Sequence, residues 1–253
     1  MPSSVTVTSV ERAFSILEAL DASRLGMNVS AISRKLGIPK STAHVIIGTS
    51  VNLGYVVREP NNKTFGLSLK VYALGRENMR SLHLPEVSLA PMKWLAAKAG
   101  LTVQLAMLEK NQAIYVQKVD GPGLILFDTF IGKRTTLHCT AVGKVLLAHA
   151  PEPIQREFLA KASFARHTRN TITSAAALRG AIEKIRRQGF AVDDQEEELG
   201  IRCLAVPVVN PSGAFVAALG LTGTVDQVEA ANIPKLVATA RRAASRIYAA
   251  PGS

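Results

Sequence analysis

The clearest pattern of apolar and polar positions lies in the first quarter of the chain. An apolar stripe at helical spacing ends at Gly37, which can take the left-handed conformation of a helix end, and a second helical stretch covers residues 39–54. Two β-prone runs with a turn between them follow, at residues 55–58, 59–62 and 63–67. This order of helix, tight turn, helix and hairpin predicts a winged helix-turn-helix, whose second helix would read duplex DNA.

A further helix is expected before this motif. Val10, Phe14, Leu17 and Leu20 recur at the spacing that places them on one helical face, and Ser9 is the expected N-cap. A winged module needs such a helix to pack against the other two, so this stretch supports the same interpretation.

The hairpin is followed by a pattern that predicts a linker helix. Ser68 can cap a helix whose apolar stripe is Leu67, Val71 and Leu74. Such a helix between two domains often contacts a second copy of the chain; the alternative is an ordinary helix of the second domain. The expected domains are a winged helix-turn-helix over residues 1–67, a linker helix over 68–80 and an effector-binding domain over 81–253.

Polar side chains gather where the module would meet DNA. The second helix begins with Lys40, Ser41, Thr42 and His44, which can donate to phosphates and base edges near a helix N-terminus that favours anions. Basic residues elsewhere in the module extend this expected interface: Arg34 in the first helix of the motif, and Arg58 and Lys63 beside the turn of the wing. The alternative is a small helical module whose basic face only contacts solvent.

The remainder of the chain predicts an antiparallel α+β domain, because strands follow one another through hairpins instead of regular βαβ units. The expected helices cover residues 87–99, 140–150, 153–159, 174–188 and 227–248. The expected strands cover residues 102–108, 113–119, 124–127, 190–194, 201–209 and 214–222, with a loop at 132–134.

The composition agrees with this interpretation and excludes several other classes of protein. The net charge of +11 suits a polyanionic partner, and 253 residues with 47% hydrophobic content are enough for two cores. Cys139 and Cys203 lie far apart without zinc-finger spacing, so neither a metal nor a cofactor is expected and a reduced cytoplasm fits. We see no signal peptide and no run long enough to span a membrane, so no membrane partner is expected.

The chain resembles the IclR family of bacterial transcriptional regulators over residues 8–248. Four motifs carry this resemblance: VERAFSILEAL; LGIPKSTAHVII followed by NLGYVV and the wing; LHCTAVGKVLLAHAP; and GFAVDDQEEELGIRCLAVPVVNPSGAFVAALGLTG. The resemblance implies a winged helix-turn-helix, a linker helix, a C-terminal effector domain of GAF-like topology, and dimers or dimers of dimers. At Val45 the family usually has an arginine, so valine could offer only apolar contact, for instance to a thymine methyl group.

Carried over by position, the effector pocket of the family corresponds to Ala141, Val142, Asp193 and Cys203. The amides at the start of the helix at 140–150 could hold a carboxylate, and Asp193 or the Cys203 thiol could contact a hydroxyl or carbonyl group. Candidate counter-ions nearby are Arg134, His138, Lys144 and Arg202. Each of these can also serve only the fold or face solvent.

We therefore expect a ligand-responsive regulator that binds a pseudo-palindromic operator of a catabolic operon as a dimer. A repressor is expected in preference to an activator. Its effector would be a small organic or aromatic acid. One alternative is a hydrolase or isomerase that uses the acidic residues at 193–198, because paired carboxylates can perform acid–base catalysis. No catalytic motif in the sequence supports this alternative. The other is a DNA-binding protein that needs no ligand.

Overall fold

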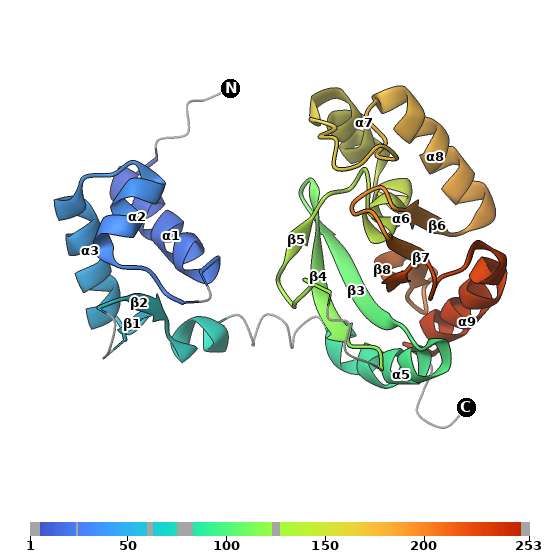
Figure 1. The fold of residues 1–253 in the computed structure, drawn as a ribbon, viewed down its shortest axis with the longest axis horizontal. Coiled ribbons are helices and arrows are strands. Elements are labelled where there is room, and N and C mark those ends of the chain that lie inside the picture. The colour runs from blue at the N-terminus through green and yellow to red at the C-terminus, as the bar shows by residue number, and fades with distance from the viewer. Residues whose placement is uncertain (1–5, 24, 60–62, 75–82, 123–126, 249–253) are drawn as a thin grey trace. The chain divides into compact units, whose positions relative to one another are not determined.

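The protein folds as two compact units, which divide after residue 82. This computed structural model describes residues 6–23, 25–59, 63–74, 83–122 and 127–248. Figure 1 shows the first unit as helices with a short hairpin and the second as a curved sheet with helices packed on it. No helix in the described ranges is both long and apolar enough to cross a membrane.

In the described part of the first unit, three helices and a hairpin precede the helical segment at residues 69–74 and confirm the winged helix-turn-helix. The helices are α1 (Thr8–Asp21), α2 (Val29–Leu36) and α3 (Lys40–Asn52), and the hairpin pairs β1 (Val56–Arg58) with β2 (Phe65–Leu67). Asn28 caps α2 by accepting from the Ala31 amide, and Gly37 ends it in the left-handed region with φ of 64°. The core contains Ile16, Leu20, Ile32, Ala43, Ile47 and Val56.

The packed face of α1 differs from the prediction. Ile16, Ala19 and Leu20 are its buried residues, whereas Val10 is 50% and Phe14 is 62% exposed. Apolar residues follow two overlapping stripes of this helix, so their period alone could not select the face that meets α2 and α3. The N-cap is Val7 and not Ser9, because the helix begins at Thr8 without a side-chain cap.

The segment after the hairpin is helical over residues 69–74, and the Ser68 hydroxyl accepts a hydrogen bond from the Lys70 amide at 3.1 Å. The rest of the predicted linker helix, residues 75–80, lies outside the described residues. The same holds for most of the predicted wing turn and of the strand at 124–127.

A six-stranded antiparallel sheet in the order β5-β4-β3-β8-β7-β6 forms the second unit, as the hairpin pattern predicts. The strands are β3 (Thr102–Glu109), β4 (Gln112–Val119), β5 (Arg134–Thr135), β6 (Ala191–Asp194), β7 (Ile201–Val209) and β8 (Phe215–Thr224). The short strand β5 occupies part of the predicted loop at 132–134, because its backbone pairs with β4 at Ile114.

Helices pack on this sheet and on each other. They are α5 (Leu84–Ala99), α6 (Ala141–His149), α7 (Glu152–Lys161), α8 (Ala175–Gln188) and α9 (Ile233–Arg246), and α5 and α9 lie side by side (Figure 1). The closing helix was predicted over 227–248 but begins only at Ile233, after a short 3-10 turn. Pro234 has no N–H to donate, so it suits the first turn of α9 and not a helix interior.

Helix α6 packs against the sheet through small residues. Its buried contacts include Ala106, Ala205 and Ala218 of three neighbouring strands. A Cβ placed on Gly143 would lie 2.3 Å from the Thr136 carbonyl oxygen, and one on Gly220 of β8 would lie 2.7 Å from the Val142 side chain. Both glycines therefore permit the short distance between α6 and the structure beneath it.

We predict that Gly143→Ala lowers the free energy of unfolding of the second unit by about 2 kcal/mol, because the added methyl group overlaps backbone atoms that cannot move away freely. The control is Gly180→Ala in α8, where an added Cβ meets no atom within 4 Å. This control should raise the free energy of unfolding by about 0.5–1 kcal/mol, the difference in helix propensity. Denaturant titration followed by the fluorescence of Trp94, the single tryptophan, measures both. Equal stability of the two variants would contradict the close packing.

Candidate functional site

One face of α3 is open to solvent along its length. Lys40, Ser41, His44, Val45, Gly48 and Thr49 are exposed, and the buried residues Ala43, Ile47 and Ser50 hold the opposite face against the core. Val45 is 65% exposed. The exposed residues follow the i, i+4 and i+1, i+5 spacing of one helical surface, which is the surface that a recognition helix presents to the major groove.

The predicted DNA contacts divide into three groups. Lys40, Ser41 and His44 lie on the exposed face of α3, whereas Thr42 is half-buried beside it. Arg34, Arg58 and Lys63 are exposed outside α3, on α2 and beside the wing turn. Gly48 and Thr49 were not among the predicted DNA contacts, although continuing the spacing from Lys40 and Ser41 by two turns identifies both.

A cavity of about 520 Å³ lies in the second unit. Strands β3, β4, β7 and β8 and the first turn of α6 contribute to its wall. The five predicted effector residues all line it: Arg134, Ala141, Val142, Asp193 and Cys203. The structure thus brings together positions that are separated by up to 69 residues of chain (203 minus 134). Their contact with an effector stays a prediction.

The first turn of α6 lies at the wall of this cavity. Thr140 caps the helix: its hydroxyl accepts from the Gly143 amide at 3.0 Å, and its carbonyl accepts from the Lys144 amide at 2.9 Å. The amides of Ala141 and Val142 come before these bonds, and both residues line the cavity. Helix N-termini bind carboxylates and phosphates through such donors and through the helix dipole.

Hydrogen bonds connect several polar groups of the cavity wall. The Cys203 sulfur lies 3.2 Å from the Thr222 hydroxyl, which donates to the Gln104 amide oxygen at 3.0 Å. Gln104 is only 2% exposed, and its amide nitrogen lies 3.5 Å from the Thr129 hydroxyl. Burial raises the pKa of the Cys203 thiol, so this group stays a neutral, weak donor or acceptor.

Asp193 is the most strongly perturbed carboxylate of the cavity. It is 3% exposed, and burial raises its pKa from 3.8 to about 7. The Glu196 amide donates to its Oδ1 at 2.7 Å and favours the charged form, but this contribution is smaller than the cost of desolvation. Asp193 can therefore act as donor or acceptor near neutral pH.

The predicted counter-ions are already engaged. Arg134 reaches the cavity, yet its guanidinium group pairs with Glu109 at 2.7 Å. His138, Lys144 and Arg202 are not among the residues that line the cavity: the His138 ring bonds to the Ala165 carbonyl, Lys144 pairs with Glu196, and Arg202 pairs with Asp194 at 2.8 Å. The backbone amides of α6 therefore offer a better anion site than these side chains.

Four charged residues of the wall were not among the predicted effector residues: Asp128, Lys133, Glu197 and Glu198. Of these, Lys133 pairs with Asp128 at 3.1 Å. Within the acidic stretch at 193–198, only Asp193 was predicted as an effector contact. In the structure, the carboxylates of this stretch have different surroundings. Asp194 and Glu196 form ion pairs outside the cavity, whereas Asp193 and Glu197 line it.

A winged helix-turn-helix with an open recognition helix, joined in one chain to a unit with a buried polar cavity, defines a DNA-binding regulator of transcription. The chain belongs to the IclR family: residues 9–60 match the IclR helix-turn-helix domain, and residues 77–249 match the family described as bacterial transcriptional regulator IclR C-terminal. Members of this family regulate transcription and are not enzymes, so the hydrolase or isomerase alternative is wrong.

Individual relatives match almost the whole chain. The transcriptional regulator XynR of Escherichia coli is 32% identical over 248 residues, which are 97% of this chain and 98% of that protein. The IclR structure from Thermotoga maritima has a TM-score of 0.76 at 28% identity, and covers 95% of this chain and 97% of its own. An IclR homolog from Microbacterium hydrocarbonoxydans, solved in complex with 4-hydroxybenzoate, has a TM-score of 0.83 at 26% identity, with coverages of 94% and 97%.

We predict that His44→Ala and Lys63→Ala weaken DNA binding in different ways. Loss of a base-reading side chain should weaken the operator about tenfold or more but leave random DNA unchanged, whereas loss of a phosphate contact should weaken both and reduce the salt slope by about one. Both variants should be titrated at several salt concentrations against an operator selected from random duplexes. Equal losses on operator and random DNA for His44→Ala would contradict its role in reading.

We also predict a pH-dependent stability that depends on Asp193. Because its folded pKa is about 7 and its ordinary value is 3.8, the folded protein holds a proton that the unfolded chain releases between these values. The free energy of unfolding therefore falls as the pH rises towards 7, by up to about 1.4 kcal/mol per pH unit. Asp193→Asn keeps the acceptor oxygen and removes the titration, so its stability should fall less between about pH 5 and about pH 8. Parallel pH profiles of the two proteins in denaturant titrations would refute this assignment.

Proposed function

We propose that this protein is an effector-controlled repressor of a catabolic operon, and that its effector is a small hydroxylated carboxylic acid bound in the cavity of the second unit. It would act in the cytoplasm as a dimer or a dimer of dimers on a pseudo-palindromic operator. The observation that carries the proposal is that Ala141 and Val142, the first two residues of α6, line a cavity of about 520 Å³. Their amides are the donors that a helix N-terminus offers to a carboxylate.

The remaining polar wall supports an effector with hydroxyl groups. Asp193, Glu197 and the Cys203–Thr222 pair can accept hydrogen bonds from such groups. The charged residues of the wall are Asp128, Asp193, Glu197 and Glu198 against Lys133 and Arg134. Since both cations already pair with carboxylates, a ligand with one negative charge at the α6 end suits the cavity better than a dianion.

The solved homolog from Microbacterium hydrocarbonoxydans, complexed with 4-hydroxybenzoate, supports this class of effector. That ligand has one carboxylate and one hydroxyl group, which are the two functions that the α6 amides and the acceptors of the wall can bind. Hydroxylated aliphatic acids, such as sugar acids, have the same two functions and belong to the same proposal.

The effector would act by a shift in population. It must bind one arrangement of the protein better than the other, and its differential affinity sets how far the DNA-binding equilibrium can move. In a repressor, the effector favours the arrangement that has the lower affinity for the operator. Transcription from a reporter that carries this operator therefore rises when the effector is added. A fall in reporter transcription would identify an activator instead.

We predict that thermal unfolding of the full-length protein distinguishes the two ligand functions. A ligand that binds only the folded protein at 100 times its Kd adds about 2.7 kcal/mol to the free energy of unfolding. Hydroxylated acids, with 4-hydroxybenzoate as the aromatic and gluconate as the aliphatic probe, should raise the melting temperature more than benzoate, and 4-hydroxybenzamide should not raise it. An equal rise with acid and amide would contradict carboxylate binding at α6. No rise with any acid would favour a protein that needs no ligand.

The matched variant for this experiment is Ala141→Pro. Proline removes one amide donor from the first helical turn and is tolerated there, as in α5, α7 and α9, and Thr140 already has the extended backbone that a residue before proline requires. Affinity for the acid should fall about tenfold, the value of one hydrogen bond to a charged group. Ala175→Pro makes the same change at the first turn of α8, away from the cavity, and should leave affinity unchanged.

A further inference from the structure

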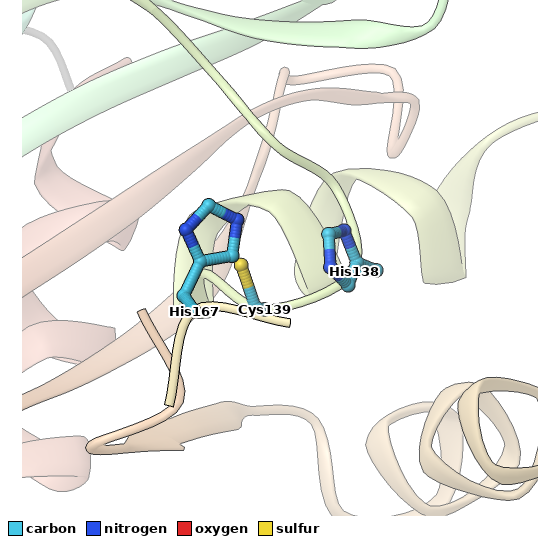
Figure 2. A group of neighbouring side chains, drawn as sticks. All are labelled: His138, Cys139 and His167. Atoms are coloured by element: carbon cyan, nitrogen blue, oxygen red, sulfur yellow. The ribbon is translucent and has the colours of Figure 1, made fainter. Parts of the chain in front are cut away.

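Three metal-binding side chains meet beside the start of α6. His138 and Cys139 precede this helix, and His167 lies in the segment between α7 and α8. One ligand-capable atom from each residue lies within 4.8 Å of the other two. Figure 2 shows the Cys139 sulfur beside the His167 ring, with the His138 ring next to them. The first two residues are buried and the third is exposed, so the cluster is reachable from solvent.

The hydrogen bond of His138 prepares one ring nitrogen for a metal. Its Nε2 lies 3.0 Å from the Ala165 carbonyl oxygen, and a carbonyl oxygen only accepts, so Nε2 carries the hydrogen. The lone pair is then on Nδ1. Histidine ligands in metal sites usually donate their second ring nitrogen to a carbonyl or carboxylate in this way, which fixes the tautomer and the orientation of the ring.

Glu197 lies beside this cluster as a hydrogen-bond partner of Cys139. Its Oε2 accepts from the Cys139 thiol at 3.3 Å and from the Thr136 hydroxyl at 3.5 Å. Among the described residues, no lysine or arginine forms an ion pair with this carboxylate, in contrast to its neighbour Glu196. A cation bound to the Cys139 sulfur would therefore have an unpaired carboxylate close by.

We propose that His138, Cys139 and His167 form a binding site for a divalent transition metal of the zinc class, with a water molecule as the fourth ligand. Two imidazoles and a thiolate are ligands that tetrahedral Zn²⁺ accepts together with a water molecule, and the thiolate excludes Mg²⁺ and Ca²⁺ as preferred ions. Ligand atoms bound to one zinc lie about 3.5 Å apart, given bonds of about 2.0–2.3 Å. The exposed His167 side chain can rotate to shorten the present separations.

Metal binding at this site would reach the effector cavity. Glu197 and Thr136 line the cavity and also contact Cys139, so a bound ion replaces the proton that the thiol now shares with the Glu197 carboxylate. The ion also connects the segment that carries His167 to the start of α6. Zinc binding would therefore change the same cavity wall that contacts the proposed organic acid, and it would do so independently of that acid.

The experiment is a titration of chelator-treated, full-length protein with Zn²⁺ alone, by calorimetry, followed by loading with Co²⁺ to detect the thiolate-to-cobalt absorption band. We expect one Zn²⁺ per chain and a cobalt band that Cys139→Ser abolishes. His167→Gln should weaken zinc binding about tenfold or more, as loss of an imidazole ligand does. Because His167 is exposed, this variant should fold normally, which a thermal melt checks.

The matched control is His83→Gln, another exposed histidine of the second unit, whose side chain makes no capping hydrogen bond. It should bind zinc as the parent protein does. Less than one equivalent of bound Zn²⁺, or equal affinity of the His167→Gln and His83→Gln variants, would overturn the proposal. If Cys139→Ser fails to fold, the two histidine variants decide alone. Metal binding is read directly here, so the result does not depend on whether an organic acid is the effector.

Discussion

Close packing at the N-terminal end of α6 is the constraint on which the second unit depends. Thr140 satisfies the Gly143 amide, and the missing side chain of Gly143 lets the helix lie against the backbone of Thr136 and Leu137. Gly220 does the same on the sheet below Val142. With the helix at this distance, Ala141 and Val142 lie at the cavity wall. Cys139, just before α6, then lies beside Glu197 of the acidic segment at 193–198.

The electrostatics of this region follow from burial. Lys144 is 3% exposed and is held by Glu196 and by the Val192 carbonyl, so one positive charge is used to hold the acidic segment in place. Asp193 and Glu197 stay without such a partner among the described residues. Their position beside backbone donors and a thiol gives the cavity both donor and acceptor groups, with little free positive charge on side chains.

The two units contribute different kinds of surface. In the first, the core below α3 is apolar and small, and the functional face consists of side chains that make few contacts with the rest of the unit. In the second, the functional groups are buried and connected by hydrogen bonds, so a substitution in the cavity affects both stability and binding. Variants of α3 should therefore separate function from stability more cleanly than variants of the cavity wall do.

The local sequence pattern predicts most helices and strands, but it does not predict which helix face is buried or which distant side chains meet. The helix-turn-helix, the antiparallel sheet and the helix expected over residues 174–188 follow from periodicity, glycine positions and turn residues, which act within a few neighbours. The face of α1 and the start of α9 were misjudged, because packing partners and the position of Pro234 decided them.

The sequence by itself determined that the chain has a helix-turn-helix, because that signal is local and periodic, and that its second domain carries motifs that resemble those of the family. Only the tertiary structure decided that Arg134 is paired with Glu109, that Thr42 is half-buried beside the open face of α3, and that His167 lies next to Cys139. These contacts join residues that are distant in the chain, and their geometry depends on how the helices and the sheet pack. No spacing rule along the sequence contains that information.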